Sequence, residues 1–487
     1  MLKRVLKALY LTTFLTVVFI SLVVSSVIIW YRNNFGERLT MLIFTLKHAE
    51  GANMEIVKEV ITSCIPSLIV WLLISWVAIL MFIKKEVSKS AYLALTGFAV
   101  IALAIFAVIA EKSLKVYEYY ESRYAETDLY EKYYVIPDAS AITSSVPKNL
   151  IYVYMESMET AFASESEGGH QKDVNYIPNL TDLAAKNISF SNSDKLGGFY
   201  QVNGTGRAAA ATFASMTGVP YLASTTDISS GLMALPAIGN ILTEKGYYLE
   251  YICGSDADFS GRRTFFGKHG DYTIMDYQAA IDKGYIDEDY YVWWGYEDRK
   301  LYEIAESEIT EAANHRDTPF DITILTVDTH YTDGYLCDLC DWKYDDRYAN
   351  VISCADNQIS DFLSWCMEQD WYDDTVIIIQ GDHPYMRKSV LLNHLRDSDR
   401  TTYDCFINTG YDPATLNLHN RVFTCMDMFP TTLAAIGFEI PENRLALGTN
   451  LFSDRPTLAE EIGLKKLDAE LNKHSEWYME NAANEYK

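Results

Sequence analysis

The segment NLIYVYMESMET, residues 149–160, decides the fold of the larger part of this chain. It begins with a short apolar, β-branched run over 149–155 and turns acidic at Glu156. Similar apolar runs occur at 247–252, 321–327 and 375–379, and we expect helices between the runs at 232–245, 299–314 and 348–368. Continuous apolar strands that alternate with amphipathic helices indicate an α/β fold with a mostly parallel central sheet.

Ionisable residues follow three of these predicted strands. Glu156 ends the first, Asp328 to His330 follow the third, and Asp382 and His383 follow the fourth. Any one of them could be a solvated loop residue, but ligands of open α/β sheets bind outside the carboxyl ends of the strands. The joint placement therefore predicts a site. Carboxylates with one imidazole suit Mn²⁺, Mg²⁺ or Zn²⁺, so Glu156, Asp382 and His383 are the predicted metal ligands.

A glycine-rich turn, Gly204-Thr205-Gly206-Arg207, leads into an alanine-rich segment that starts at Ala208. Such a turn exposes backbone N–H groups at a helix N-terminus, which is a suitable place for a phosphate. A flexible turn before a packed helix explains the same pattern without a ligand.

Three uncharged runs in the first 112 residues predict three transmembrane helices, at about 8–31, 60–83 and 90–110. Basic residues precede the first run and fill the loop between the second and third: Lys3, Arg4, Lys7, Lys84, Lys85 and Lys89. By the positive-inside rule these places are cytoplasmic. We therefore expect a multi-pass protein of the cell membrane whose residues after about Lys112 are extracytoplasmic.

The net charge of −26 is divided unequally. Residues 1–112 carry +5, so the remainder carries −31, which excludes nucleic acid as a partner. A phosphate site in so acidic a part must concentrate cations locally. Beyond the membrane region we expect a linker at 113–146, a catalytic domain at 147–455 and a helical C-terminal tail at 456–487.

The chain has eight cysteines, and only Cys64 falls inside a predicted span. Cys337-x-x-Cys340, followed by Cys354 and Cys366, could form a zinc knuckle. One or two disulfides are the preferred interpretation for an extracytoplasmic domain. The sequence leaves their connectivity open.

Residues 147–455 resemble the sulfatase and alkaline phosphatase superfamily. Within it they are most similar to membrane phosphoglycerol transferases, namely the lipoteichoic acid synthases and the periplasmic-glucan phosphoglycerol transferases. The likeness rests on seven blocks in order: 149–160, 177–184, 204–220, 259–270, 326–334, 379–384 and 427–452.

The resemblance implies roles for particular residues. Glu156, Asp382 and His383 match the metal ligands, and the metal would be Mn²⁺, with Mg²⁺ or Zn²⁺ as alternatives. His330 and Arg262 match residues that contact the substrate and assist catalysis. Gly206 and Arg207 belong to the segment that carries the nucleophile and binds the substrate. The implied reaction transfers glycerol phosphate from phosphatidylglycerol, through a covalent threonine intermediate, to a glycan or a glycerol phosphate polymer.

This chain departs from the family pattern at one position. The family threonine that is both nucleophile and metal ligand corresponds to Ala208, which has no hydroxyl. Three explanations are open: deliberate replacement of the threonine, which we favour because the other site residues are present; a natural loss of activity; or use of Thr205 or Thr212 instead. The alternatives to a transferase are a metal-dependent phosphodiesterase and a catalytically inactive sensor or assembly protein of the cell envelope. A sulfatase is disfavoured because Cys64-Ile65-Pro66, the only run near the sulfatase motif, lacks its arginine.

Overall fold

The computed structural model describes residues 2–35, 39, 42, 54–83, 87–144, 146–222, 235–315, 318–386, 391–392, 394–396 and 399–482. The chain forms two compact units, Met1–Tyr124 and Ala125–Lys487.

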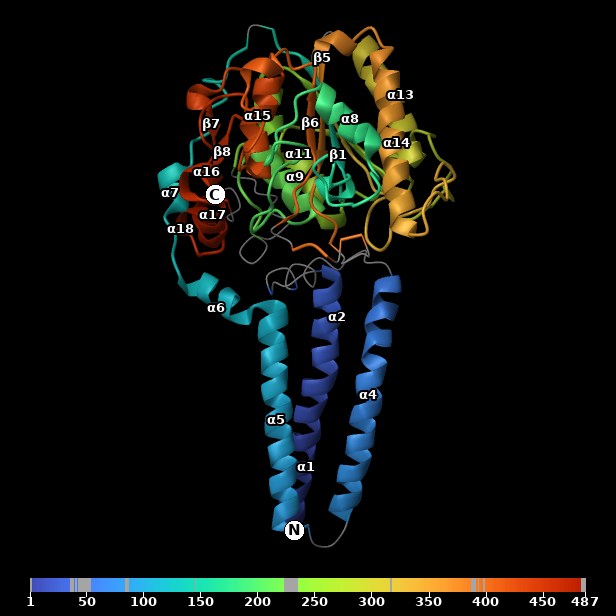
Figure 1. Cartoon of the computed structure of the whole chain (residues 1–487), viewed down its shortest axis with the longest axis vertical. Coiled ribbons are helices and arrows are strands. Elements are labelled where there is room, and N and C mark those ends of the chain that lie inside the picture. The colour runs from blue at the N-terminus through green and yellow to red at the C-terminus, as the bar shows by residue number, and fades with distance from the viewer. Residues whose placement is uncertain are drawn as a thin grey trace. The chain divides into compact units, whose positions relative to one another are not determined.

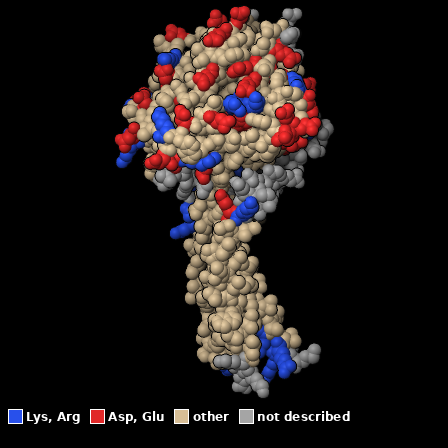
Figure 2. Space-filling model, turned by 90° about the vertical axis from the view of Figure 1, so that its right-hand side faces the viewer, with Lys and Arg blue, Asp and Glu red and all other residues tan. Residues whose placement is uncertain are grey.

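The first unit is helical. Three of its helical segments are long and apolar enough to cross a membrane: Lys3–Asn34, Lys58–Ile83 and Lys89–Leu114. This confirms the three N-terminal apolar helices expected from the sequence. The helices of the unit are α1 (Leu2–Phe19), a π-helical turn η1 (Ile20–Val24), α2 (Ser25–Phe35), α4 (Met54–Ile83), α5 (Lys89–Leu114) and α6 (Val116–Tyr124). Figure 2 shows their surface almost free of charge along its length, whereas Asp and Glu are spread over the second unit.

Buried side chains join the three apolar segments of the first unit. Phe14 and Val18 of α1 pack with Ala78 of α4. The Trp71 indole donates to the carbonyl of Leu15 at 3.0 Å. These contacts show that the helices of the first unit pack on one another.

The second unit contains a six-stranded sheet in the order β3-β2-β4-β1-β5-β6 (Figure 1). All neighbouring strands are parallel except β5 and β6, which are antiparallel. β1 lies in the middle, so Tyr152 pairs with Thr323 on one side and Ile378 on the other. The strands are β1 (Asn149–Met155), β2 (Tyr248–Cys253), β3 (Thr273–Met275), β4 (Phe320–Leu325), β5 (Thr375–Gly381) and β6 (Asp404–Ile407), with a small hairpin of β7 (Arg444–Leu445) and β8 (Gly448–Thr449) apart from them.

Helices cover both faces of the sheet. In Figure 1, α13 and α14 lie on one side, and α9 and α15 lie on the other. α13 packs on β2 and β4, and α9 packs on α15. The helices of the unit are α7 (Leu129–Tyr133), α8 (Pro178–Lys186), α9 (Ala208–Thr217), α10 (Ile238–Glu244), α11 (Arg262–Lys268), α12 (Tyr277–Asp282), α13 (Asp298–His315), α14 (Arg347–Met367), α15 (Met428–Ala435), α16 (Leu458–Ile462), α17 (Leu464–Leu471) and α18 (Glu476–Asn481).

Most predicted elements agree with the structure, and the disagreements have physical causes. The helix expected at 232–245 spans only 238–244, because Ala237 precedes it in an extended conformation; residues 232–234 lie outside the described residues. β3 and β6 were not predicted, since strands of three and four residues are too short for a periodic signal.

Candidate functional site

Glu156, Asp382 and His383 lie together at the carboxyl end of the sheet. One ligand atom from each falls within 4.8 Å of the others, and all three residues are buried. His383 Nε2 is 3.4 Å from Glu156 Oε1 and 3.8 Å from Asp382 Oδ2. The pairing of β1 with β5 explains the meeting, because Met155 is opposite Gly381 and the next residues of both strands leave the sheet side by side.

Hydrogen bonds from Ser157 orient the carboxylates of Glu156 and Asp382. The Ser157 hydroxyl donates to Glu156 Oε1 at 2.7 Å, and the Ser157 N–H donates to Asp382 Oδ1 at 2.8 Å. Ser157 has a φ of 54°, in the left-handed region, and this sharp turn lets one residue contact both acids. Asp382 Oδ2 is buried without a hydrogen-bond partner among the described residues. A buried carboxylate oxygen with no donor fits a bound cation.

The histidine is oriented in the way metal ligands usually are. His383 Nδ1 is 2.8 Å from the carbonyl of Pro384, so this nitrogen donates its proton there and Nε2 faces the two carboxylates. Gly381, which precedes the pair, passes so close to Met158 that a Cβ would lie 1.9 Å from its carbonyl oxygen. A glycine is therefore required there for the two turns to approach.

Burial dominates the electrostatics of the site. It raises the pKa of Asp382 to about 7. It also raises the pKa of Glu156, and the neighbouring Asp382 carboxylate raises it further. Burial and mutual repulsion make it costly to ionise both carboxyl groups. A cation bound between them would stabilise the ionised form of both. The donor set and its electrostatics thus suit a divalent cation.

His330 lies on the loop after β4, close enough to Glu156 and His383 to interact with them electrostatically. Burial lowers the His330 pKa, which favours the neutral imidazole. Its Nδ1 is 2.8 Å from the carbonyl of Tyr331, which leaves Nε2 for another partner. The ring packs edge-on against Trp294, with centroids 4.8 Å apart.

Arg262 is the first residue of α11 and is buried. Its guanidinium donates to the Ser255 hydroxyl at 2.8 Å and to the carbonyls of Asp256 and Phe259 at 2.7 and 3.0 Å. It also interacts electrostatically with His330. Most N–H groups of the Arg262 guanidinium therefore donate to residues of the loop just before α11. A contact between Arg262 and the substrate stays a prediction.

The glycine-rich turn adopts the predicted form, with Ala208 as the first residue of α9. Arg207 precedes the helix in an extended conformation and its side chain does not cap it. Gly204 has a φ of +81°, and a Cβ there would lie 2.9 Å from the Tyr221 carbonyl oxygen. Ala208 is half-buried. That its methyl group faces the metal ligands stays a prediction, as does phosphate binding by Gly206 and Arg207.

Gln201 connects this turn to the acidic site. Its Nε2 donates to the Asp382 carbonyl at 3.4 Å and to the Thr402 hydroxyl at 3.2 Å, while its Oε1 accepts from Thr205 at 2.9 Å. Neither Gln201 nor Ser157 was predicted as a site residue. Ser157 had a signal, since it directly follows the acid that ends β1, but Gln201 had none because Asp382 and Thr402 are far away in the sequence.

Both threonines near position 208 are buried, and a nucleophilic role for either stays a prediction. Thr205 is fully buried; its hydroxyl lies 2.9 Å from both Gln201 Oε1 and the Val202 carbonyl, and it accepts from the Val202 N–H at 3.0 Å. Thr212 is also buried, one helical turn beyond Ala208. The Thr205 hydroxyl is thus held within its own loop, and the Thr212 hydroxyl is enclosed in the helix packing.

The expectation of disulfides is wrong for this structure. All eight cysteines are among the described residues and all are free. Cys253, Cys366, Cys405 and Cys425 are buried at separate places, whereas Cys337, Cys340 and Cys354 form a cluster.

Residues 148–438 match the Sulfatase family. The chain is 28% identical over 317 residues to phosphoglycerol transferase I of Salmonella choleraesuis (strain SC-B67), and 28% identical over 248 residues to phosphoglycerol transferase I of Xanthomonas campestris pv. campestris (strain B100). The matches cover 63% and 48% of this chain, but only 39% and 34% of the two relatives. The fold is similar to a protein in the alkaline phosphatase superfamily from Vibrio parahaemolyticus, with a TM-score of 0.52, 21% identity and coverage of 67% of this chain and 77% of that one.

Proposed function

This chain belongs to the sulfatase family, and we propose that its site is that of a membrane-anchored phosphoglycerol transferase. In this proposal the donor is phosphatidylglycerol, and the acceptor is an extracytoplasmic glycan or glycerol phosphate polymer. The observation that carries it is the buried group of Glu156, Asp382 and His383, linked through Gln201 to an uncapped helix N-terminus at Ala208. Three helices able to cross a membrane support a lipid donor.

Glu156, Asp382 and His383 would hold the divalent cation, with Mn²⁺ preferred over Mg²⁺ or Zn²⁺. The cation would neutralise negative charge on the phosphoryl oxygens. Ser157 keeps both carboxylates aimed at one point, and His383 presents Nε2 because its Nδ1 is occupied. His330, neutral and with a lone pair on Nε2, would accept the proton of the attacking hydroxyl, and in its protonated form it would donate to a phosphate oxygen. Arg262 would add positive charge from behind His330.

The nucleophile is the missing part. With threonine at position 208, its Oγ would form a bond to phosphorus while the bond from phosphorus to the diacylglycerol oxygen breaks. The threonine proton would leave with the diacylglycerol, either directly or through His330. An acceptor hydroxyl oxygen would then form a bond to phosphorus while the bond from phosphorus to the threonine Oγ breaks, and the acceptor proton would pass to that Oγ. Because Ala208 has no hydroxyl, we expect the present chain to bind the glycerol phosphate headgroup without turning it over.

Restoring the hydroxyl tests this proposal. Ala208→Thr in the full chain should release diacylglycerol from phosphatidylglycerol vesicles when Mn²⁺ is supplied, and the unmodified chain should not. Thr205→Ala added to the restored chain should have a much smaller effect than Asp382→Ala, which should abolish both release and bound metal. Activity of the unmodified chain, lost on Thr205→Ala, would overturn the assignment of position 208.

An inert Ala208→Thr chain that still binds metal would instead favour the inactive envelope protein. Release of free glycerol phosphate at the same rate with and without an acceptor glycan would favour a phosphodiesterase. Each result therefore selects one function.

A further inference from the structure

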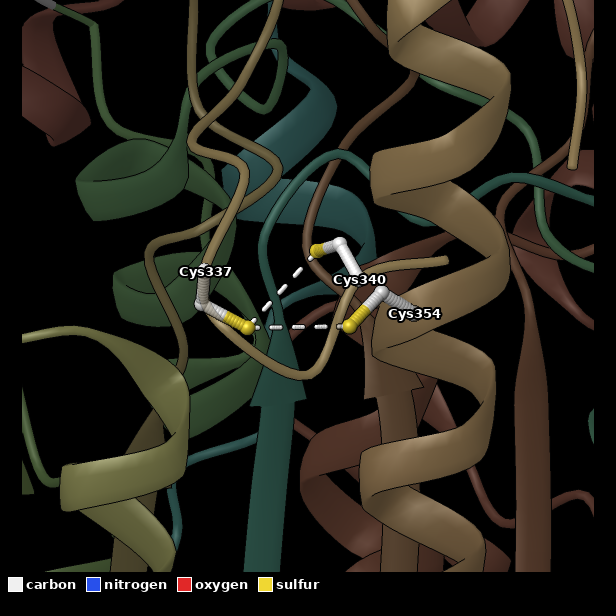
Figure 3. Close-up of side chains that lie close together, drawn as sticks. All are labelled: Cys337, Cys340 and Cys354. Carbon is white, nitrogen blue, oxygen red and sulfur yellow. Dashed lines mark hydrogen bonds between the residues drawn. The ribbon is translucent and has the colours of Figure 1, made fainter. Parts of the chain in front are cut away.

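Cys337, Cys340 and Cys354 bring their sulfurs together at a second place in the domain (Figure 3). Cys337 and Cys340 belong to the loop between β4 and α14, and Cys354 belongs to α14. Cys337 Sγ is 3.6 Å from Cys340 Sγ and 3.7 Å from Cys354 Sγ. Cys337 and Cys354 are buried, and Cys340 is partly exposed.

The sulfur separations match metal coordination better than covalent pairing. A disulfide would join two sulfurs at about 2.05 Å and leave the third thiol unused. Thiolates around a tetrahedral Zn²⁺, with bonds of about 2.3 Å, lie about 3.8 Å apart. Both measured distances are close to the second value. The short Cys337-x-x-Cys340 spacing is also common in structural zinc sites.

Gln358 provides an independent second observation. It lies one helical turn after Cys354, is buried, and its Nε2 is 3.4 Å from Cys354 Sγ and 3.8 Å from Cys337 Sγ. Its Oε1 has no hydrogen-bond partner in the described part of the chain. Rotating the amide by a half-turn would place Oε1 at the present position of Nε2, 3.4 and 3.8 Å from the two sulfurs. An oxygen that is the fourth tetrahedral ligand of Zn²⁺ is expected about 3.6 Å from each coordinated sulfur.

A backbone hydrogen bond also closes the part of the loop that carries two of the sulfurs. The Cys340 N–H donates to the Cys337 carbonyl at 3.0 Å, which closes the turn between them.

We propose that Cys337, Cys340 and Cys354 bind a soft divalent cation, zinc by preference, with Gln358 Oε1 as the fourth ligand. Among the described residues no further Cys, His, Asp or Glu joins the three sulfurs. The metal has a structural role and is separate from the carboxylate site of Glu156. The proposal does not depend on the proposed transferase function.

The position of the cluster indicates what the metal stabilises. The loop that carries Cys337 and Cys340 also carries His330, and several hydrogen bonds already fix it to α14. The Tyr348 hydroxyl donates to the Thr329 carbonyl at 3.0 Å, and Arg347 donates to the Gly334 carbonyl at 3.1 Å. A metal bridge from this loop to Cys354 would add a further connection and hold His330 beside the sheet edge.

Cobalt binding tests the proposal in the full chain, purified in detergent with a reductant and stripped of metal. Added Co²⁺ should give the near-ultraviolet charge-transfer absorption of a cobalt thiolate at one equivalent. Cys354→Ala should lose this band, and Gln358→Leu should weaken Co²⁺ binding at least about tenfold. Cys366→Ala, a buried cysteine of the same helix, should keep the band. Asp382→Ala should also keep it, because the carboxylate site offers no thiolate.

Two results would overturn the metal site. One is a reduced, folded, unmodified chain that takes up Co²⁺ without a thiolate band. The other is a disulfide from Cys337 to Cys340 or Cys354, found by mass spectrometry of non-reduced peptides from freshly isolated membranes. Both measurements use the unmodified chain, so they decide the question even if Cys354→Ala fails to fold.

Discussion

A buried ion pair connects the two turns that carry the proposed metal ligands. Arg400 donates to both oxygens of Glu159, through Nε at 2.7 Å and Nη2 at 2.5 Å, and through Nη2 to the Tyr385 carbonyl at 2.7 Å. The Tyr385 N–H in turn donates to Glu159 at 3.1 Å. Glu159 is three residues after Glu156, and Tyr385 is two after His383. The Glu159 side chain is fully buried and that of Arg400 is 11% exposed.

Arg400→Leu should therefore be strongly destabilising. It leaves the Glu159 carboxylate buried without its cation, which costs about 3–5 kcal/mol when one partner of such a pair is removed. Hydrogen exchange of the full chain should report this loss in the amides of β1 and β5, as exchange faster by roughly two to three and a half orders of magnitude. The double variant Glu159→Leu, Arg400→Leu should recover more than half of the lost stability, because no charge is then left buried.

The exposed pair Lys186–Asp182 provides the control, since its side chains are 69% and 61% exposed. Lys186→Leu should change stability by less than about 1 kcal/mol. The reasoning fails if Arg400→Leu costs no more than this control. It also fails if the double variant is as unstable as Arg400→Leu alone, because the loss would then come from packing and not from the uncompensated charge.

Three further predictions concern other parts of the chain. Ser157→Ala should weaken Mn²⁺ binding about 10- to 100-fold in a metal titration, because it removes the hydroxyl that orients Glu156, while Ser164→Ala should not. Burial raises the pKa of Asp321 to about 7, so the folded chain holds a proton there that the unfolded chain has lost. Stability should fall as pH rises between about 4 and 7, and Asp321→Asn should remove up to about 4 kcal/mol of that fall; equal pH profiles for both chains would contradict the assignment. Protease added to intact spheroplasts should release a fragment close in size to residues 113–487, and complete protection would refute the extracytoplasmic orientation.

The primary structure was sufficient for features that depend on local patterns. Uncharged runs of 21 or more residues predict apolar helices. The basic residues around these runs predict the orientation of the chain in the membrane. The run at 149–155 becomes the central strand because every residue from Leu150 to Met155 must be buried. Glu156, Asp382 and His383 were recognisable because parallel strands end at one edge of a sheet.

Tertiary structure decided the features that depend on contacts between distant segments. The short antiparallel β6 has no periodic signal of its own, and it forms by pairing with β5. Gln201 becomes part of the site only when folding brings Asp382 and Thr205 to its two ends. Cysteine spacing left zinc and disulfides both open. Only the packing of the loop against α14 set the Cys337 and Cys354 sulfurs 3.7 Å apart and placed the Gln358 amide beside them, because sequence spacing does not determine a distance between two separately folded elements.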